Sequence, residues 1–328
     1  MDKARHATDK KLEQMEKDIS KIYQQAKKEL TEEWNKYMER GEKRLSSLLA
    51  SGDEEAYQKA LTNYTLRNAW YKDMVDATTA KLANVNQIAL DYTKNQMPEI
   101  YALNYNQFGE EMDKEGLSEE SGIRFNLVDE ATVRRMIKDG DIEMPNQEKR
   151  LSIPKDQRWN TRQINSSVLQ GIVQGESLRE IAKRLLPIMD NNKNAAIRNA
   201  RTLVTGAECR GRLDSYKDAQ EEGIILKKVW MATPDGHTRD WHLDMDGQEV
   251  DIDEAFVDGK GNELMYPGDP GGAPETVYNC RCTMVSHVVG FERNGKVATV
   301  DYEAEPTLHD RQIEAEEKRR AEKEKKND

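Results

Sequence analysis

Cysteine, aromatic residues and long apolar runs are all scarce in this 328-residue sequence. Three cysteines, an odd and low count, argue against a disulfide framework and favour a reducing compartment. Aromatic residues make up 6% and charged residues 34% of the chain, which favours long solvated helices over one large globular core. Because no apolar run is long enough for a signal peptide or a membrane span, we expect a protein made in the cytoplasm, without a membrane partner.

The chain also lacks the positive charge that general nucleic-acid binding needs. Its formal net charge is -11, so on average it repels a phosphate backbone. One local basic cluster, on nearby turns of a predicted helix, leaves contact with DNA open as an alternative: Arg198, Arg201, Arg210 and Arg212.

Apolar residues recur at steps of three and four over residues 12–49 and again over 57–92. The short polar segment 51–53 separates the two stretches, which predicts an antiparallel hairpin of two long amphipathic helices. We expect Pro98 to end or restart the second helix, because proline lacks an amide hydrogen and clashes with the preceding turn. Residues 109–128 have no helical pattern and are predicted to form a loop.

The middle of the chain is predicted to be helical, with recognisable caps. Asp129 can accept from the free amides of a short helix that Gly140 closes. Further helices are expected over 161–174, from Leu178 after a capping box of Ser177 and Glu180, and from about 193 to 222.

The pattern changes after residue 223, where strands and turns replace helices. Residues 224–232 are apolar and β-branched, as in a strand, and the turn-rich segment 234–274 follows. Asn294–Gly295 predicts a hairpin between two later strands. The sequence therefore predicts an α+β protein in four parts: an N-terminal helical region (1–118), a helical connector (119–192), a small turn-rich α+β domain (193–300) and a charged tail (301–328).

The most specific pattern lies between Trp230 and Met284. It resembles the Mu F-like domain of phage minor head (minor capsid) proteins over roughly residues 190–285. The residues that carry this structural motif, in order along the chain, are Trp230, Asp235, Arg239, His242, Asp246, Gly247, Tyr266, Pro267, Asn279, Cys280, Arg281 and Cys282.

The resemblance implies a structural, non-enzymatic component of a tailed-bacteriophage head that acts in head morphogenesis. It further implies a place in the virion, beside the portal protein, with the major capsid or scaffold protein as further partners. An internal head protein that associates with phage DNA is the first alternative.

His242, Cys280 and Cys282 are candidate metal ligands. In one branch of the resembled family a C-x-x-C pair and a further histidine accompany the C-R-C sequence; here Arg239 and His242 replace the pair. Zinc takes about four N, S or O ligands, and His237 or an aspartate would have to add the fourth. Because the fuller ligand set is missing, we expect a buried core without a cofactor, with zinc as the competing reading. Cys280 and Cys282 alternate in a predicted strand, so their side chains should point to one face. In either case the three side chains should lie together.

No complete catalytic set is visible, so no catalytic residue is assigned. His237, His242 and the nearby aspartates would suit a metal-dependent nuclease or hydrolase, the second functional alternative. Arg239, Asp240, Asp244 and Asp246 are instead predicted to form an ion-pair network that fixes the turns. The glycine-rich stretch 268–272 lacks the lysine and hydroxyl of a phosphate-binding loop, which argues against nucleotide binding.

Overall fold

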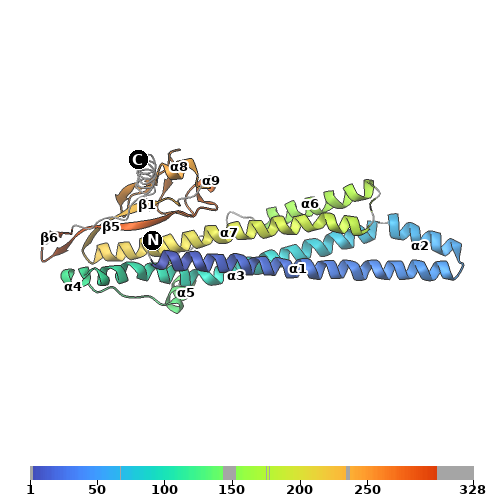
Figure 1. Ribbon diagram of the computed structural model, residues 1–328, viewed down its shortest axis with the longest axis horizontal. Coiled ribbons are helices and arrows are strands. Elements are labelled where there is room, and N and C mark those ends of the chain that lie inside the picture. The colour runs from blue at the N-terminus through green and yellow to red at the C-terminus, as the bar shows by residue number, and fades with distance from the viewer. Residues whose placement is uncertain are drawn as a thin grey trace, which may run out of the picture. The chain divides into compact units, whose positions relative to one another are not determined.

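The computed structural model shows an α+β protein, as predicted, with long helices and a small sheet-containing region (Figure 1). It describes residues 3–66, 68–142, 153–174, 176, 178–233 and 237–300. Two compact units are each assembled from separated segments of the chain. Unit 1 comprises residues 1–13, 93–147 and 198–328; unit 2 comprises 14–92 and 148–197. The sequential four-part division therefore stays a prediction.

Unit 2 is a helical assembly built from apolar stripes. It contains most of α1 (Lys3–Ala50), α2 (Glu54–Leu66), the first half of α3 (Asn68–Lys114), α6 (Ile153–Val173) and the start of α7 (Leu178–Glu221). The apolar steps of three and four place one face of each helix inside, since 3.6 residues complete a turn. Fully buried members of these stripes include Ile19, Leu30, Leu82, Ile164, Ile181 and Leu185.

The two internal prolines do not interrupt the helices as we expected. α3 continues through Pro98, and α7 continues through Pro187 as one helix where the sequence predicted two. The prediction of a break at Pro98 was wrong, because packing against neighbours on both sides of a proline can outweigh the loss of one backbone hydrogen bond. Tertiary contacts also extend α3 to Lys114, into the segment predicted to be a loop, and α4 (Leu117–Ser121) follows.

The predicted caps of the short helix are confirmed. In α5 (Glu130–Asp139) the Asp129 carboxylate accepts from the amide of Thr132 at 2.7 Å, and Gly140 closes the helix with a positive φ of 88°. Ser177 and residues 301–328, where we predicted a capping box and a charged tail, lie outside the described residues.

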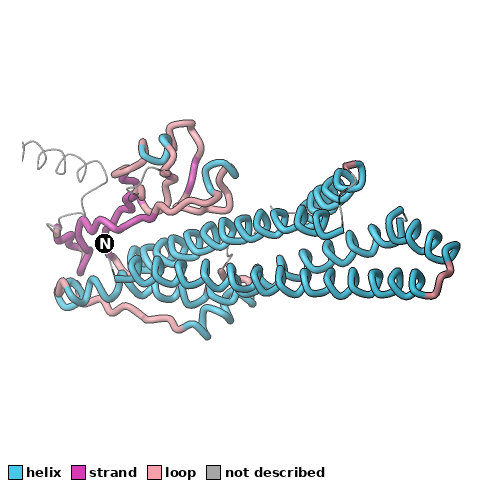
Figure 2. The backbone as a smooth tube through the Cα atoms, turned by 45° about the vertical axis from the view of Figure 1, so that its right-hand side comes forward, coloured by secondary structure: helices cyan, strands magenta, loops and turns pink. Residues whose placement is uncertain are grey.

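Unit 1 carries the sheet. Its four strands are ordered β2-β1-β5-β6 and all neighbouring pairs are antiparallel. β1 (Ile224–Met231) and β5 (Thr283–Arg293) form the centre, and the predicted Asn294–Gly295 hairpin joins β5 to β6 (Lys296–Thr299). Strands β1 and β5 lie against the last turns of α7, as Figures 1 and 2 show.

Between β1 and β5 the chain is mostly loop (Figure 2). The short elements in this segment are α8 (Asp240–Leu243), β2 (Glu249–Asp251), β3 (Phe256–Val257), β4 (Glu263–Leu264) and α9 (Pro274–Val277). Ladder hydrogen bonds cannot hold such a segment alone, so side chains must fix it. The sequence motif lies within this segment and at its two ends.

Candidate metal centre

His242, Cys280 and Cys282 come together, which confirms the predicted cluster. The Nδ1 atom of His242 lies 3.6 Å from the Sγ atom of Cys280 and 3.5 Å from that of Cys282. One donor atom from each residue lies within 4.8 Å of the other two. All three side chains are buried, with 1% of His242 and 2% of each cysteine exposed.

The two cysteines lie in a loop and not in a strand, where we had predicted them. β5 begins at Thr283, just after Cys282, and Asn279 adopts a left-handed backbone conformation with a φ of 57°. Asparagine tolerates that region better than most residues do. The two thiols therefore lie on the same side because of the conformation of this loop, and not because residues alternate along a strand.

Three threonine hydroxyl groups bind the backbone of this loop. Thr202 of α7 accepts from the amide of Asn279 at 2.9 Å. Thr205, also of α7, donates to the carbonyl of Cys280 at 2.7 Å. Thr233, just after β1, donates to the carbonyl of Arg281 at 2.5 Å. These bonds satisfy buried backbone groups, so the loop is fixed before any ligand arrives.

His242 reaches the cluster from α8. Its backbone amide donates to the carbonyl of Arg239, and the guanidinium of Arg239 donates to the carbonyl of Tyr278. The imidazole also meets the ring of Trp230 edge to face, with 5.6 Å between centroids. Arg239 thus ties the helix that carries His242 to the loop that carries the thiols.

We predicted an ion-pair network around Arg239. In the structure, Arg239 and Asp246 bind backbone groups. Asp246 accepts from the amide of Ala232 at 2.7 Å, and the amide of Gly247 donates to the carbonyl of Trp230 at 2.9 Å. Gly247 has a φ of 77°, which suits glycine at this turn. The Asp-Gly pair therefore fastens the turn back onto β1.

Tyr266 and Pro267 are buried at the start of the glycine-rich turn. At the next residue, Gly268, a Cβ atom would lie 2.8 Å from the amide nitrogen of Gly206 in α7, and φ is 82°. This part of the motif thus allows two backbones to approach closely. Asp235, the remaining motif residue, lies outside the described residues.

The hydrogen bond between the two thiols shifts their pKa values in opposite directions. The hydrogen bond with Cys282 lowers the pKa of Cys280. The same bond, together with burial, raises the pKa of Cys282 well above that of a free thiol. His237 is exposed and is not part of the cluster, so it does not supply the fourth ligand that we considered for it.

Two charged side chains of unit 1, Glu208 and Lys228, are buried although we did not predict this from the sequence. Glu208 is fully buried, accepts from Arg5 and from Thr283 at 2.6 Å each, and lies 3.8 Å from Arg212. Its place inside an apolar run of α7, with an arginine four residues later, is the signal that could have found it. The contact with Arg5, 203 residues away, has no such signal.

Lys228 is the second such group. Its ammonium donates to the carbonyls of Ile252 and Met265 at 2.9 Å each and lies 5.2 Å from the centre of the Phe256 ring. It shares the alternation of β1 with Leu226 and Trp230, which are also buried, and that alternation could have predicted its burial. Lys228 therefore binds backbone carbonyls of the segment between β1 and β5. Thr202 and Thr205 bind the end of the same segment from α7.

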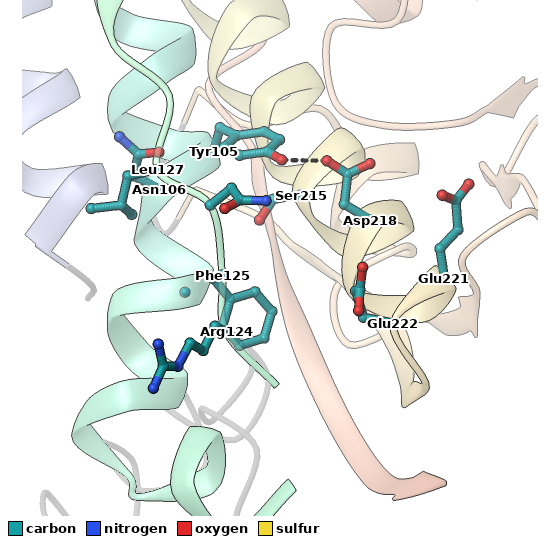
Figure 3. A pocket seen from close by; sticks show the side chains of 11 residues that line it. Tyr105, Asn106, Arg124, Phe125, Leu127, Ser215, Asp218, Glu221 and Glu222 are labelled. Carbon is teal, nitrogen blue, oxygen red and sulfur yellow. Dashed lines mark hydrogen bonds between the residues drawn. The ribbon is translucent and has the colours of Figure 1, made fainter. Parts of the chain in front are cut away.

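A separate pocket in unit 1 lies between the end of α3 and the end of α7 (Figure 3). Tyr105 donates to Asp218 there, and Glu221 and Glu222 add further negative charge. Burial raises the pKa of Tyr105, so this phenol stays protonated. The lining residues include Ser215 and carboxylates but no histidine, cysteine or lysine.

Comparison with known proteins places this motif in a family. A model of the phage Mu protein F-like family matches residues 162–285, which include α8, both cysteines and the loop that holds them. Over this segment the chain is similar to the phage Mu protein F-like family. No solved structure matches the chain.

Three curated relatives are similar over part of their length. Minor head protein GP7 of Bacillus phage SPP1 is 29% identical over 144 residues, 43% of this chain and 46% of that protein. NAD(+)--arginine ADP-ribosyltransferase EFV of Enterococcus faecalis is 37% identical over 128 residues, 39% of this chain and 26% of that protein. Uncharacterized protein YqbB of Bacillus subtilis is 26% identical over 131 residues. The chain spans less than half the length of each relative.

Proposed function

We propose that this chain is a minor head protein of a tailed bacteriophage that acts in head morphogenesis, with a structural and not an enzymatic role. The proposal is carried by the Mu F-like match over residues 162–285, together with the similarity of the chain to a protein named as a phage minor head protein. The motif residues that the structure describes also suit a structural role, because their hydrogen bonds fix loops and none of these residues orients a nucleophile.

The partners we propose are the portal protein and the major capsid or scaffold protein, in a particle that carries the chain in the virion. Long amphipathic helices can lay an apolar face against other proteins. No helix among the described residues combines the length and apolarity needed to cross a bilayer.

The structure weakens the alternative of DNA binding through the arginine cluster. Arg212 is buried against Glu208 and Asn104, Arg210 pairs with Asp214, and Arg201 contacts Asn279. Arginines held by carboxylates and amides within the chain do not neutralise phosphates. Arg198 alone of the four is exposed.

The name of the Enterococcus faecalis relative gives the enzymatic alternative a specific form, transfer of ADP-ribose from NAD(+) to arginine. That match covers 26% of the relative, and the region that carries its activity is not identified by the match. We expect the purified chain to transfer no labelled ADP-ribose to arginine-rich protein and to cleave no DNA with Mg²⁺, Mn²⁺ or Zn²⁺. Turnover in either assay that is lost with His242→Ala would overturn the structural proposal.

The direct test is incorporation into particles. The chain is co-expressed with the portal, scaffold and major capsid proteins encoded beside its gene, and the procapsids are purified on a gradient. We expect the chain to co-sediment with them, and to be lost when the portal protein is omitted. A chain that stays at the top of the gradient in every combination would contradict the proposal. If it is lost only without major capsid or scaffold protein, the placement beside the portal is wrong.

A further inference from the structure

The cluster of His242, Cys280 and Cys282 has the dimensions of a zinc site. With Zn–N bonds of about 2.0 Å and Zn–S bonds of about 2.3 Å, tetrahedral geometry puts the nitrogen and sulfur ligands roughly 3.6 Å apart. The two nitrogen–sulfur distances in the structure are 3.6 and 3.5 Å. Each distance also suits a weak S–H hydrogen bond, so further observations must separate the two readings.

The charges of the donor set suit a buried divalent cation. Two thiolates and one neutral imidazole carry the two negative charges that cancel those of Zn²⁺. A neutral assembly avoids the large cost of burying net charge at a site where all three ligands are at most 2% exposed. Sulfur and imidazole donors also select zinc over the magnesium and calcium that carboxylates bind.

The cluster is held in place by contacts that do not involve the three donor atoms. The loop backbone is fixed by Thr202, Thr205 and Thr233, and Arg239 joins that loop to α8. Ligands positioned by surrounding hydrogen bonds need little rearrangement to bind a metal.

We propose that His242 Nδ1, Cys280 Sγ and Cys282 Sγ bind one structural zinc ion. The described residues supply three donors, and water or another oxygen ligand completes the fourth position. The ion links α8 to the segment that enters β5, and so closes the long loop between β1 and β5. The proposal stands independently of the head-protein function, because it concerns the isolated chain.

The experiment begins with the full chain, expressed with zinc in the medium and purified without chelator. We expect about one zinc ion per chain by elemental analysis, and a melting temperature several degrees lower after a strong chelator, because an ion that binds only the folded state stabilises it. Cobalt substituted for zinc should give the intense near-ultraviolet absorption of thiolate coordination.

Variants then assign the ligands. Cys280→Ser, Cys282→Ser and His242→Gln should each lose zinc and the cobalt absorption. Cys209→Ala is the matched control, because Cys209 is an equally buried thiol of the same core but not a member of the ligand cluster. It should retain both signals.

Wild-type protein that takes up no zinc and melts at the same temperature with and without chelator would overturn the proposal, whether or not any variant folds. Retention of zinc in all three ligand variants, or equal loss in Cys209→Ala, would also overturn it. Cobalt absorption without thiolate character in the wild-type chain would exclude the cysteines as ligands.

Discussion

The two compact units bury their polar groups in different ways. Among the described residues of unit 2, the buried polar side chains carry no charge: Thr78, Asn160 and Asn192. Unit 1 buries two acids, an arginine and a lysine in addition to the histidine and thiols of the candidate metal centre: Glu208, Asp258, Arg212 and Lys228. Apolar stripes suffice to order helices, whereas a segment made largely of loops needs directional contacts.

This difference indicates where substitutions should be tolerated. A helix stripe loses one contact among many when a residue changes to another of similar size. A buried charge that loses its partner leaves an uncompensated charge without water, at a much larger cost. The comparison predicts that unit 1 is sensitive to single polar changes and unit 2 to changes of volume.

Glu208→Gln is expected to have the largest effect. The amide keeps the shape of the carboxylate but removes the negative charge that the guanidinium groups of Arg5 and Arg212 share in the buried site. We expect the free energy of unfolding to fall by about 3 to 5 kcal/mol, measured by urea denaturation. The matched control is Glu29→Gln in unit 2, whose ion pair with Lys81 is partly exposed; it should leave the denaturation midpoint nearly unchanged. Equal effects of the two substitutions would remove the distinction between the units.

Lys228 allows the same comparison to be made through pH. Burial lowers the pKa of Lys228 to about 8, from 10.5 for an ordinary lysine. Between these values the unfolded chain binds more protons at this position than the folded chain, so the free energy of unfolding rises with pH. The buried ammonium thus costs stability at low pH, and this cost is removed as pH rises through the folded pKa.

Lys228→Met removes this titration and is the reference for it. We expect the stability difference between the wild type and the variant to shift in favour of the wild type by about 2 kcal/mol from roughly pH 7 to pH 9.5. Chemical denaturation at several pH values measures it, and other titrating groups cancel in the difference. A difference that stays constant with pH would mean that Lys228 keeps an ordinary pKa in the folded protein.

The sequence predicted the elements of both units but not how the units are assembled. Periodicity predicted the stripes of α1 and α3, and the β-branched run predicted β1, because these patterns depend on neighbours in the chain. Pro98 was misjudged because packing along a 47-residue helix outweighs one local defect. That the first turns of α1 belong with the C-terminal sheet could not be predicted, since Arg5 meets Arg281 across 276 residues.

The sequence predicted which residues form the candidate site but not their geometry. Residue type and spacing indicated that His242, Cys280 and Cys282 would meet. The reason given for the thiols, strand alternation, was wrong, because a left-handed residue at Asn279 shapes the loop before β5 starts. The hydroxyl groups of Thr202 and Thr205 were missed because polar residues within a helix give no indication of which loop they will bind.

The smallest effect is expected in unit 2, at the buried pair of Asn160 and Asn192. Each amide donates to the other, at 3.0 and 2.9 Å, and Asn192 also accepts from Asn86 and donates to the carbonyl of Ile188. Asn160→Leu and Asn192→Leu should each lower the free energy of unfolding by about 1 to 2 kcal/mol, because the remaining buried amide loses its hydrogen bonds across the pair.

The double variant decides what the pair contributes. With both amides replaced by side chains of similar size, no unpaired amide remains between them, so the loss should be smaller than the sum of the single losses by about 1 kcal/mol. Urea denaturation of the four proteins in this cycle measures the coupling. Strictly additive losses would show that the two amides act independently in the folded unit. A coupling as large as the loss predicted for Glu208→Gln would show that uncharged buried pairs constrain unit 2 as strongly as buried charges constrain unit 1.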